Sequence, residues 1–63
     1  MENLINNYIN GNLEHAQKQA KRFKLEAIRA TLIEDYGYTF EKATRTAEYL
    51  KGHGSFQAAC DAE

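Results

Sequence analysis

Two histidines, one cysteine and one aspartate are the residues of this chain that could bind a metal ion or support nucleophilic catalysis. They are His15, His53, Cys60 and Asp61. Zinc sites need paired ligands at short spacings, and a catalytic cysteine needs a nearby base. These four residues are scattered, and Cys60 shares an apolar helical stripe with Phe56 and Ala59, which is typical of a buried, inert thiol. We therefore expect no metal site, no cofactor and no enzymatic activity.

A carboxylate pair is the other candidate for acid-base chemistry. Glu34 and Asp35 are adjacent in the sequence, so their side chains point about 100° apart on a helix. That geometry is wrong for two groups that share a proton, and the pair is expected to face solvent.

Five cations gather in one stretch of the chain, and they are the candidate nucleic-acid contacts: Lys18, Lys21, Arg22, Lys24 and Arg29. Spacings of three, four and seven residues place cations on one helix face, where they could follow phosphates. Residues 12–29 carry a charge of +3 and residues 30–63 a charge of −3. However, the pI is about 6.1, whereas basic nucleic-acid-binding domains usually exceed about 9. Nucleic acid is therefore the alternative partner.

Three tyrosines, Tyr36, Tyr38 and Tyr49, are the candidate protein-binding residues. Tyrosine combines a large apolar ring with a polar tip, which suits protein interfaces. The alternative is that one or two of these rings close the end of a small core. Phe40 is assigned to the core.

Recurring start signals indicate where the helices begin. Residues 12–16, 39–43 and 55–59 share one pattern: a capping residue, a large apolar residue, Glu or Gln, any residue, and alanine. We expect Asn12, Thr39 and Ser55 to cap helices through their side-chain oxygens. Apolar stripes at helical spacing follow each start, and a further stripe over residues 4–9 ends before a glycine. Five short helices are predicted.

The second and third helices are separated by a change of phase rather than by a breaker residue. The stripe that begins at Leu13 ends at Phe23, and a new stripe begins at Leu25. We predict a break between Phe23 and Leu25. Because no glycine or proline lies there, a continuous helix whose buried face shifts remains the alternative.

The composition favours an all-α fold. The 63 residues are 43% hydrophobic and 27% charged, with nine alanines but no valine, tryptophan or proline, which favours helices over strands. We predict a compact single-domain bundle of about four to five short helices over residues 1–63. A core of this size rarely supplies more than about 3–5 kcal/mol, so self-association or a bound partner is expected.

The segment 25–50, with its helix, its Tyr36-Gly37-Tyr38 turn and its alanine-rich second helix, resembles the middle of ubiquitin-associated three-helix domains. The resemblance covers less than half of the chain and rests on common residues. Because five helices depart from that pattern, no binding residue or function is carried over.

The functional expectation is a small non-enzymatic interaction module: an adaptor, inhibitor or regulator that binds a protein through a helix face. A nucleic-acid-binding regulator using the basic segment 18–29 is the alternative, and a structural homo-oligomer is the second. One cysteine, no apolar leader and no window of about 18 apolar residues favour a cytoplasmic protein without membrane contact.

Overall fold

The computed structural model describes residues 1–62 and contains five α-helices within that range. They are α1 (Glu2–Ile9), α2 (Leu13–Ala20), α3 (Leu25–Tyr36), α4 (Phe40–Leu50) and α5 (Phe56–Asp61). Helices account for 73% of the structure and no strand occurs in residues 1–62, so the prediction of a small all-α bundle is confirmed. None of these helices is long and apolar enough to cross a membrane.

The predicted break between the second and third helices is confirmed, and the alternative of one continuous helix is wrong. The second helix nevertheless ends at Ala20, before the predicted Phe23. A lysine from the end of α4 explains this early end, because Lys51 Nζ donates to the carbonyl oxygens of Ala20 at 3.0 Å and of Phe23 at 2.7 Å. The corner between α2 and α3 is therefore held by a tertiary contact.

The capping residues lie where the sequence predicts, but one of them acts differently. The side chains of Thr39 and Ser55 each accept a hydrogen bond from the backbone N–H three residues later, at 3.2 and 3.1 Å. Asn12 occupies the N-cap position of α2 without a side-chain cap bond. Its Nδ2 instead donates to Asn7 Oδ1 at 3.4 Å, so the prediction of an Asn12 side-chain cap is wrong.

This difference predicts unequal effects of three cap substitutions. Thr39→Ala and Ser55→Ala should each lower the free energy of unfolding by about 1 kcal/mol, because each leaves a helix N–H without its acceptor. Asn12→Ala should lower the free energy of unfolding clearly less than either of these substitutions. Urea denaturation followed by circular dichroism measures all three, and an Asn12→Ala cost equal to that of Thr39→Ala would contradict the cap assignment.

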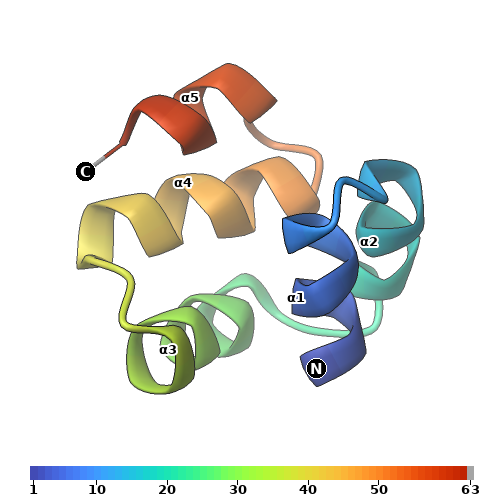
Figure 1. Ribbon diagram of the computed structural model, residues 1–63, viewed down its shortest axis with the longest axis horizontal. Helices are drawn as coiled ribbons and strands as arrows, with labels where there is room; N and C mark the ends of the chain where they lie inside the picture. Colours follow the sequence, from blue (N-terminus) through green and yellow to red (C-terminus); the bar gives the residue numbers. More distant parts are fainter. Residues whose placement is uncertain (63) are drawn as a thin grey trace.

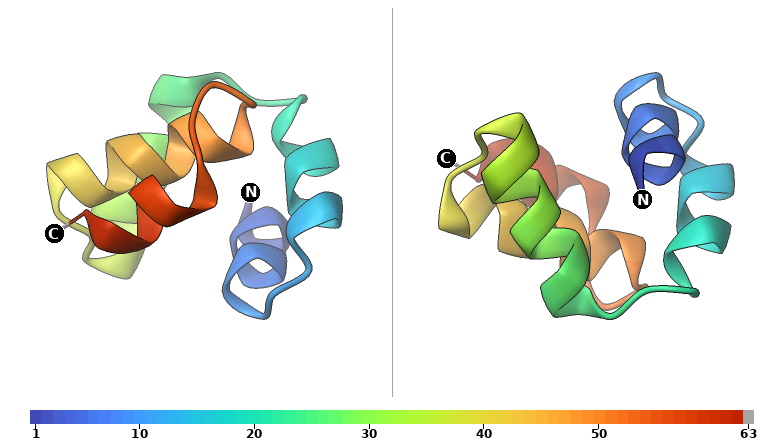
Figure 2. Two further views of the ribbon diagram at one scale, coloured as in Figure 1. Left: turned by 90° about the horizontal axis from the view of Figure 1, so that it is seen from above. Right: turned by 90° about the horizontal axis from the view of Figure 1, so that it is seen from below.

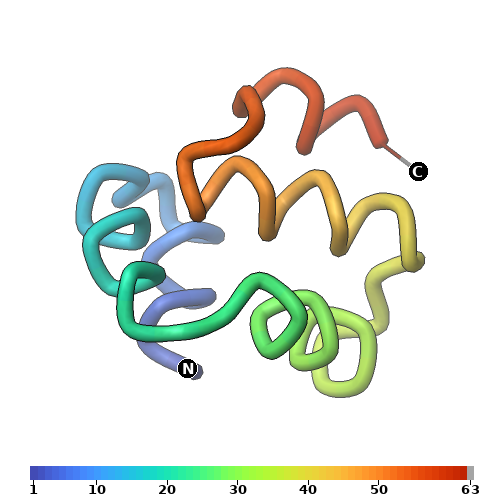
Figure 3. Tube along the Cα trace, turned by 180° about the vertical axis from the view of Figure 1, so that it is seen from behind, coloured from blue at the N-terminus to red at the C-terminus, as the bar shows by residue number. Residues whose placement is uncertain are grey.

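The helices form two groups around the central helix α4. Figure 1 shows α5 running back along one side of α4 and α3 lying on the other side. Helices α1 and α2 pack against each other at the end of α4 where that helix finishes, and both views in Figure 2 keep this pair apart from the other three helices. The trace seen from behind (Figure 3) shows residues 21–24 as the single link between α2 and α3.

The core lies where α4 meets its neighbours. Its fully buried apolar residues come from all five helices: Leu4, Ile5, Ala16, Ala20, Ile28, Leu32, Ala43, Ala47, Leu50 and Ala59. Five of these ten are alanines, so the helix axes can approach closely while few large side chains fill the centre. The core is consequently small, as the sequence predicts.

The turn between α3 and α4 depends on Gly37. This residue has φ +73°, a left-handed conformation in which other residues are strained. It allows the N–H of Tyr38 to donate to the Leu32 carbonyl at 3.0 Å, which ends α3. The turn therefore determines where Tyr38 lies relative to α4.

Four residues expected in the core or on apolar helical stripes are exposed instead, among them Phe56, which is 44% exposed. Phe40 is 64% exposed, and its ring lies beside the Arg29 guanidinium, 4.9 Å from Cζ to the ring centre. Ile9 is 54% exposed, at the end of α1. Cys60 is exposed because α5 turns Ala59 to the core, and adjacent residues point about 100° apart. The assignments of Phe40 to the core and of Cys60 to a buried stripe are both wrong.

Candidate functional site

An open groove lies between the end of α1, the start of α4 and helix α5. It is lined by Tyr8, Ile9, Tyr38, Lys42, Phe56 and Cys60 and encloses about 310 Å³. We refer to it as the aromatic groove. The three elements that form it can be followed in Figure 1, where the end of α1 approaches α4 and α5.

Three packed aromatic rings support one side of the groove. Tyr8, Tyr49 and Phe56 come from α1, α4 and α5, and their ring centres lie 6.1 Å (Tyr8 to Tyr49), 6.2 Å (Tyr8 to Phe56) and 5.5 Å (Tyr49 to Phe56) apart. These separations and the tilted or edge-on arrangements fall in the range that aromatic pairs prefer. The rings therefore join three helices at the groove.

The groove combines exposed apolar surface with one positive charge. Ile9 is 54% exposed and Phe56 is 44% exposed, and both line this groove, so it presents more than one large apolar side chain to solvent. Lys42 Nζ lies 4.9 Å from the centre of the Tyr38 ring. The ion pairs among the described residues involve Lys18 and Arg45 but not Lys42, so its charge is available to a ligand.

Burial affects the ionisation of two tyrosines in the groove. It raises the pKa of Tyr8 above the ordinary value of 10.0, and it also raises the pKa of Tyr38, because a buried phenolate loses hydration. The nearby Thr46 hydroxyl partly offsets this effect on the pKa of Tyr8. That hydroxyl is itself buried and makes no hydrogen bond of ordinary geometry, so the desolvation of Tyr8 dominates.

These shifts predict a loss of stability at high pH. A phenol whose folded-state pKa is raised stabilises the fold fully below about pH 10, and this contribution is lost as the pH rises through the folded-state pKa. The free energy of unfolding should therefore fall between about pH 9 and pH 11, and the fall should be smaller in Tyr8→Phe. Urea denaturation across this range measures it; an identical fall in Tyr8→Phe would contradict a role for Tyr8.

The structure separates the three tyrosines expected to bind protein. Tyr38 lines the aromatic groove, and Tyr49 packs against the Tyr8 and Phe56 rings beside it. Tyr36 instead lines a different hollow, which also includes residues at the start of α1. All three rings pack partly against the core. Two of the three are thus brought together, and Tyr36 is not.

The five cations of the basic segment do not share one helix face. Lys18 lies on α2, where it pairs with Glu14 at 3.7 Å. Lys21, Arg22 and Lys24 lie in the link between α2 and α3, and Arg29 lies on α3 over the Phe40 ring. The expectation of a continuous basic face is wrong, because α2 ends at Ala20.

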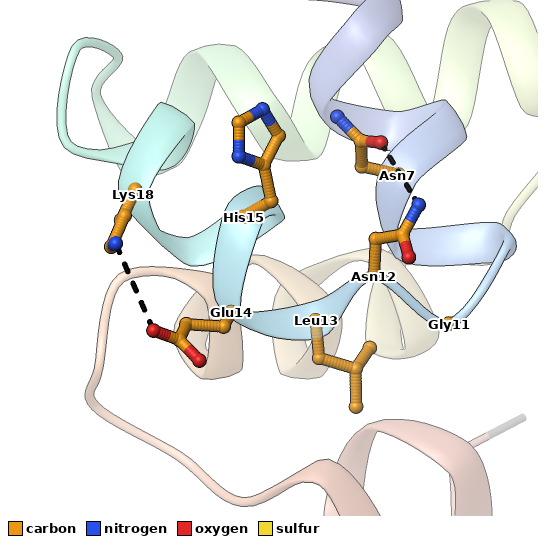
Figure 4. A pocket seen from close by; sticks show the side chains of 7 residues that line it. All are labelled: Asn7, Gly11, Asn12, Leu13, Glu14, His15 and Lys18. Atoms are coloured by element: carbon orange, nitrogen blue, oxygen red, sulfur yellow. Dashed lines mark hydrogen bonds and ion pairs between the residues drawn. The ribbon is translucent and has the colours of Figure 1, made fainter.

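A second hollow lies at the corner between α1 and α2 and encloses about 530 Å³ (Figure 4). Figure 4 shows His15 and Leu13 pointing in opposite directions from α2, while Glu14 is paired with Lys18. Both charged side chains of that pair are mostly exposed. The polar groups therefore do not converge on a common point.

The residues first considered for chemistry also lie apart. His15 is at the start of α2, His53 is in the turn after α4, and Cys60 and Asp61 are at the end of α5. In residues 1–62 no three His, Cys, Asp or Glu side chains are placed to hold a metal ion. The aromatic groove is consequently the candidate functional site.

Sequence reasoning missed most of the groove. Tyr8, Ile9 and Phe56 belong to predicted apolar stripes, and the sequence pattern assigns Cys60 to a buried stripe rather than to a binding surface. Their apolar spacing correctly indicated helices, but it could not indicate that the end of α1 meets the start of α5. A cluster drawn from three separate helices has no signature in a single sequence.

Comparisons with protein-family models, with curated proteins and with solved structures find no match for this chain. The functional proposal consequently rests on the geometry of the groove.

Proposed function

We propose that this protein is a small non-enzymatic interaction module, which binds another protein by accepting one of its apolar side chains in the aromatic groove. The observation that carries the proposal is the adjacent exposure of Ile9 and Phe56 in a groove already supported by packed rings. Apolar surface that a monomer leaves in water is covered favourably by a partner. Rings held by their neighbours also lose little side-chain entropy on binding.

The charge at the groove favours a particular kind of partner. Lys42 is the charged residue of the lining, and no carboxylate pairs with it among residues 1–62. A partner segment with an acidic residue next to its apolar anchor would pair with this ammonium group. Such pairs give orientation and specificity more than affinity. The proposed partner therefore presents an apolar side chain flanked by Asp or Glu.

The biological role that fits this proposal is that of a cytoplasmic adaptor, inhibitor or regulator. Such proteins act by occupying a surface on a partner, which requires one exposed patch and no catalytic residues. The groove supplies a patch of this kind, with both Tyr38 and Tyr8 in its lining.

The test compares three baits in affinity capture from lysate of the cells that express the protein, followed by mass spectrometry. They are the wild type, Ile9→Lys and Phe40→Lys. Ile9 lines the groove, whereas Phe40 is similarly exposed but lies outside it. A protein retained by Phe40→Lys but lost from Ile9→Lys, with an affinity reduced about 30-fold or more in a direct titration, would support the proposal.

Three other results would contradict the proposal. A protein captured equally by both variants would show that the groove is not the binding surface. Capture that disappears after nuclease treatment and after Lys21→Glu with Arg22→Glu would favour the nucleic-acid alternative, which also predicts a steep dependence on salt. A sedimentation mass that rises with protein concentration, with no foreign partner, would favour the homo-oligomer.

A further inference from the structure

The contacts between helices divide the five helices into two groups. Helices α3, α4 and α5 pack against one another around α4, and α1 and α2 pack mainly against each other. Residues 21–24 form the single covalent link between the groups (Figure 3). We call α1 and α2 the hairpin and α3 to α5 the three-helix unit. Inside the hairpin, Asn7 Nδ2 donates to Gln19 Oε1 at 2.8 Å, so the hairpin has polar contacts of its own.

The contacts between the hairpin and the three-helix unit are few, and they combine hydrogen bonds with aromatic contacts. Lys51 Nζ donates to the carbonyls of Ala20 and Phe23, and Gln17 Nε2 donates to the Tyr49 carbonyl at 3.5 Å. The Tyr8 ring meets the rings of α4 and α5. Each ion pair of the described residues lies within one helix, α2 or α4, so none of them joins the groups.

The apolar contribution of the hairpin to the core is also small. Six large side chains are fully buried, and only Leu4 and Ile5 come from the hairpin. Helix α2 contributes alanines, Ala16 and Ala20. The four others belong to the three-helix unit, including Thr46, whose buried hydroxyl lies near Tyr8 of the hairpin but makes no hydrogen bond of ordinary geometry. Separation of the hairpin would expose Leu4 and Ile5, together with the surface of the three-helix unit that they cover in the shared core.

We infer that the hairpin docks reversibly on the three-helix unit and that docking assembles the aromatic groove. Tyr8 and Ile9 belong to the hairpin, whereas Tyr38, Lys42, Phe56 and Cys60 belong to the three-helix unit. The groove therefore exists only in the docked state. If the groove binds a partner, as proposed above, docking controls that binding, because only the docked fraction of the protein is competent.

Native-state hydrogen exchange on the free full-length protein tests this inference without any partner. Backbone amides of α1 and α2 are expected to exchange through an opening that is more frequent than the opening of α4 and that depends less steeply on urea. Partial opening exposes less surface than global unfolding, which is why its urea dependence is smaller.

Two variants distinguish partial from global opening. Thr39→Ala removes a cap inside the three-helix unit, so it should raise the opening constant of α4 amides about fivefold and leave that of hairpin amides unchanged. Lys51→Met removes the two hydrogen bonds that Lys51 makes across the junction between the groups. It should raise the opening constants of the hairpin amides and of the α4 amides by about tenfold or more, because it destabilises only the docked state.

The inference fails if amides of α1, α2 and α4 share one opening constant and one urea dependence, with Thr39→Ala shifting all of them equally. It also fails if hairpin amides exchange without any urea dependence, because that behaviour indicates fraying of helix ends. Either result would leave the proposed protein binding intact, since that proposal is tested separately by Ile9→Lys.

Discussion

Ile28→Ala is expected to lower the free energy of unfolding by about 2–5 kcal/mol. Ile28 is fully buried on α3, facing the central helix of a core in which half of the fully buried apolar residues are alanines. The removed side chain leaves a cavity that few large neighbours can fill. Because a core of this size rarely supplies more than about 3–5 kcal/mol, the variant should be largely unfolded at room temperature.

Urea denaturation followed by circular dichroism measures this loss, and Ile9→Ala is its matched control. The same atoms are removed there from a side chain that is 54% exposed, so the cost should stay below about 1 kcal/mol. If Ile28→Ala does not fold, Ile28→Val gives the same test with an expected cost of about 0.5–1.5 kcal/mol. An equal loss of unfolding free energy in Ile28→Ala and Ile9→Ala would contradict the placement of Ile28 in the core.

Lys51→Met is expected to lower the free energy of unfolding by about 1.5–3 kcal/mol. The ammonium group of Lys51 donates at 3.0 Å to the carbonyl of Ala20, the last residue of α2, and at 2.7 Å to that of Phe23 in the link after it. A positive charge at the end of a helix is also favourable with respect to the helix dipole. Methionine keeps the apolar part of the side chain but removes every donor, so the substitution isolates the hydrogen bonds.

Lys18→Met serves as the control for charge removal. Lys18 pairs with Glu14 at 3.7 Å, and both side chains are mostly exposed, so its substitution should cost no more than about 0.5 kcal/mol. Urea midpoints of the two variants give the comparison directly. If the two substitutions cost the same, Lys51 does not hold the corner between α2 and α3.

Local chemistry made much of the helix pattern predictable. Thr39 and Ser55 cap α4 and α5, and both contacts involve residues three apart. Gly37 ends α3 because a left-handed residue is needed there. The ion pairs Glu14 to Lys18 and Glu41 to Arg45 join residues one helical turn apart. Each of these features depends on neighbours along the chain.

The predictions that were wrong concern features that depend on contacts with distant parts of the chain. Helix α2 ends early because Lys51 reaches its last carbonyls, and this broke the predicted basic face of residues 18–29. Phe40 follows a good cap and looks like a core residue, but at the start of α4 it stays 64% exposed, with the Arg29 side chain of α3 beside its ring. The exposure of Cys60 likewise depends on which side of α5 faces α4.

The sequence by itself determined an all-α chain, its helix starts and the alanine-rich faces that pack, because propensity, capping and periodicity act within a few residues. The tertiary structure alone decided that Tyr8, Tyr49 and Phe56 meet, and therefore where the aromatic groove lies. Contact between helices distant in the sequence depends on the packing of the whole bundle. No local pattern encodes that packing.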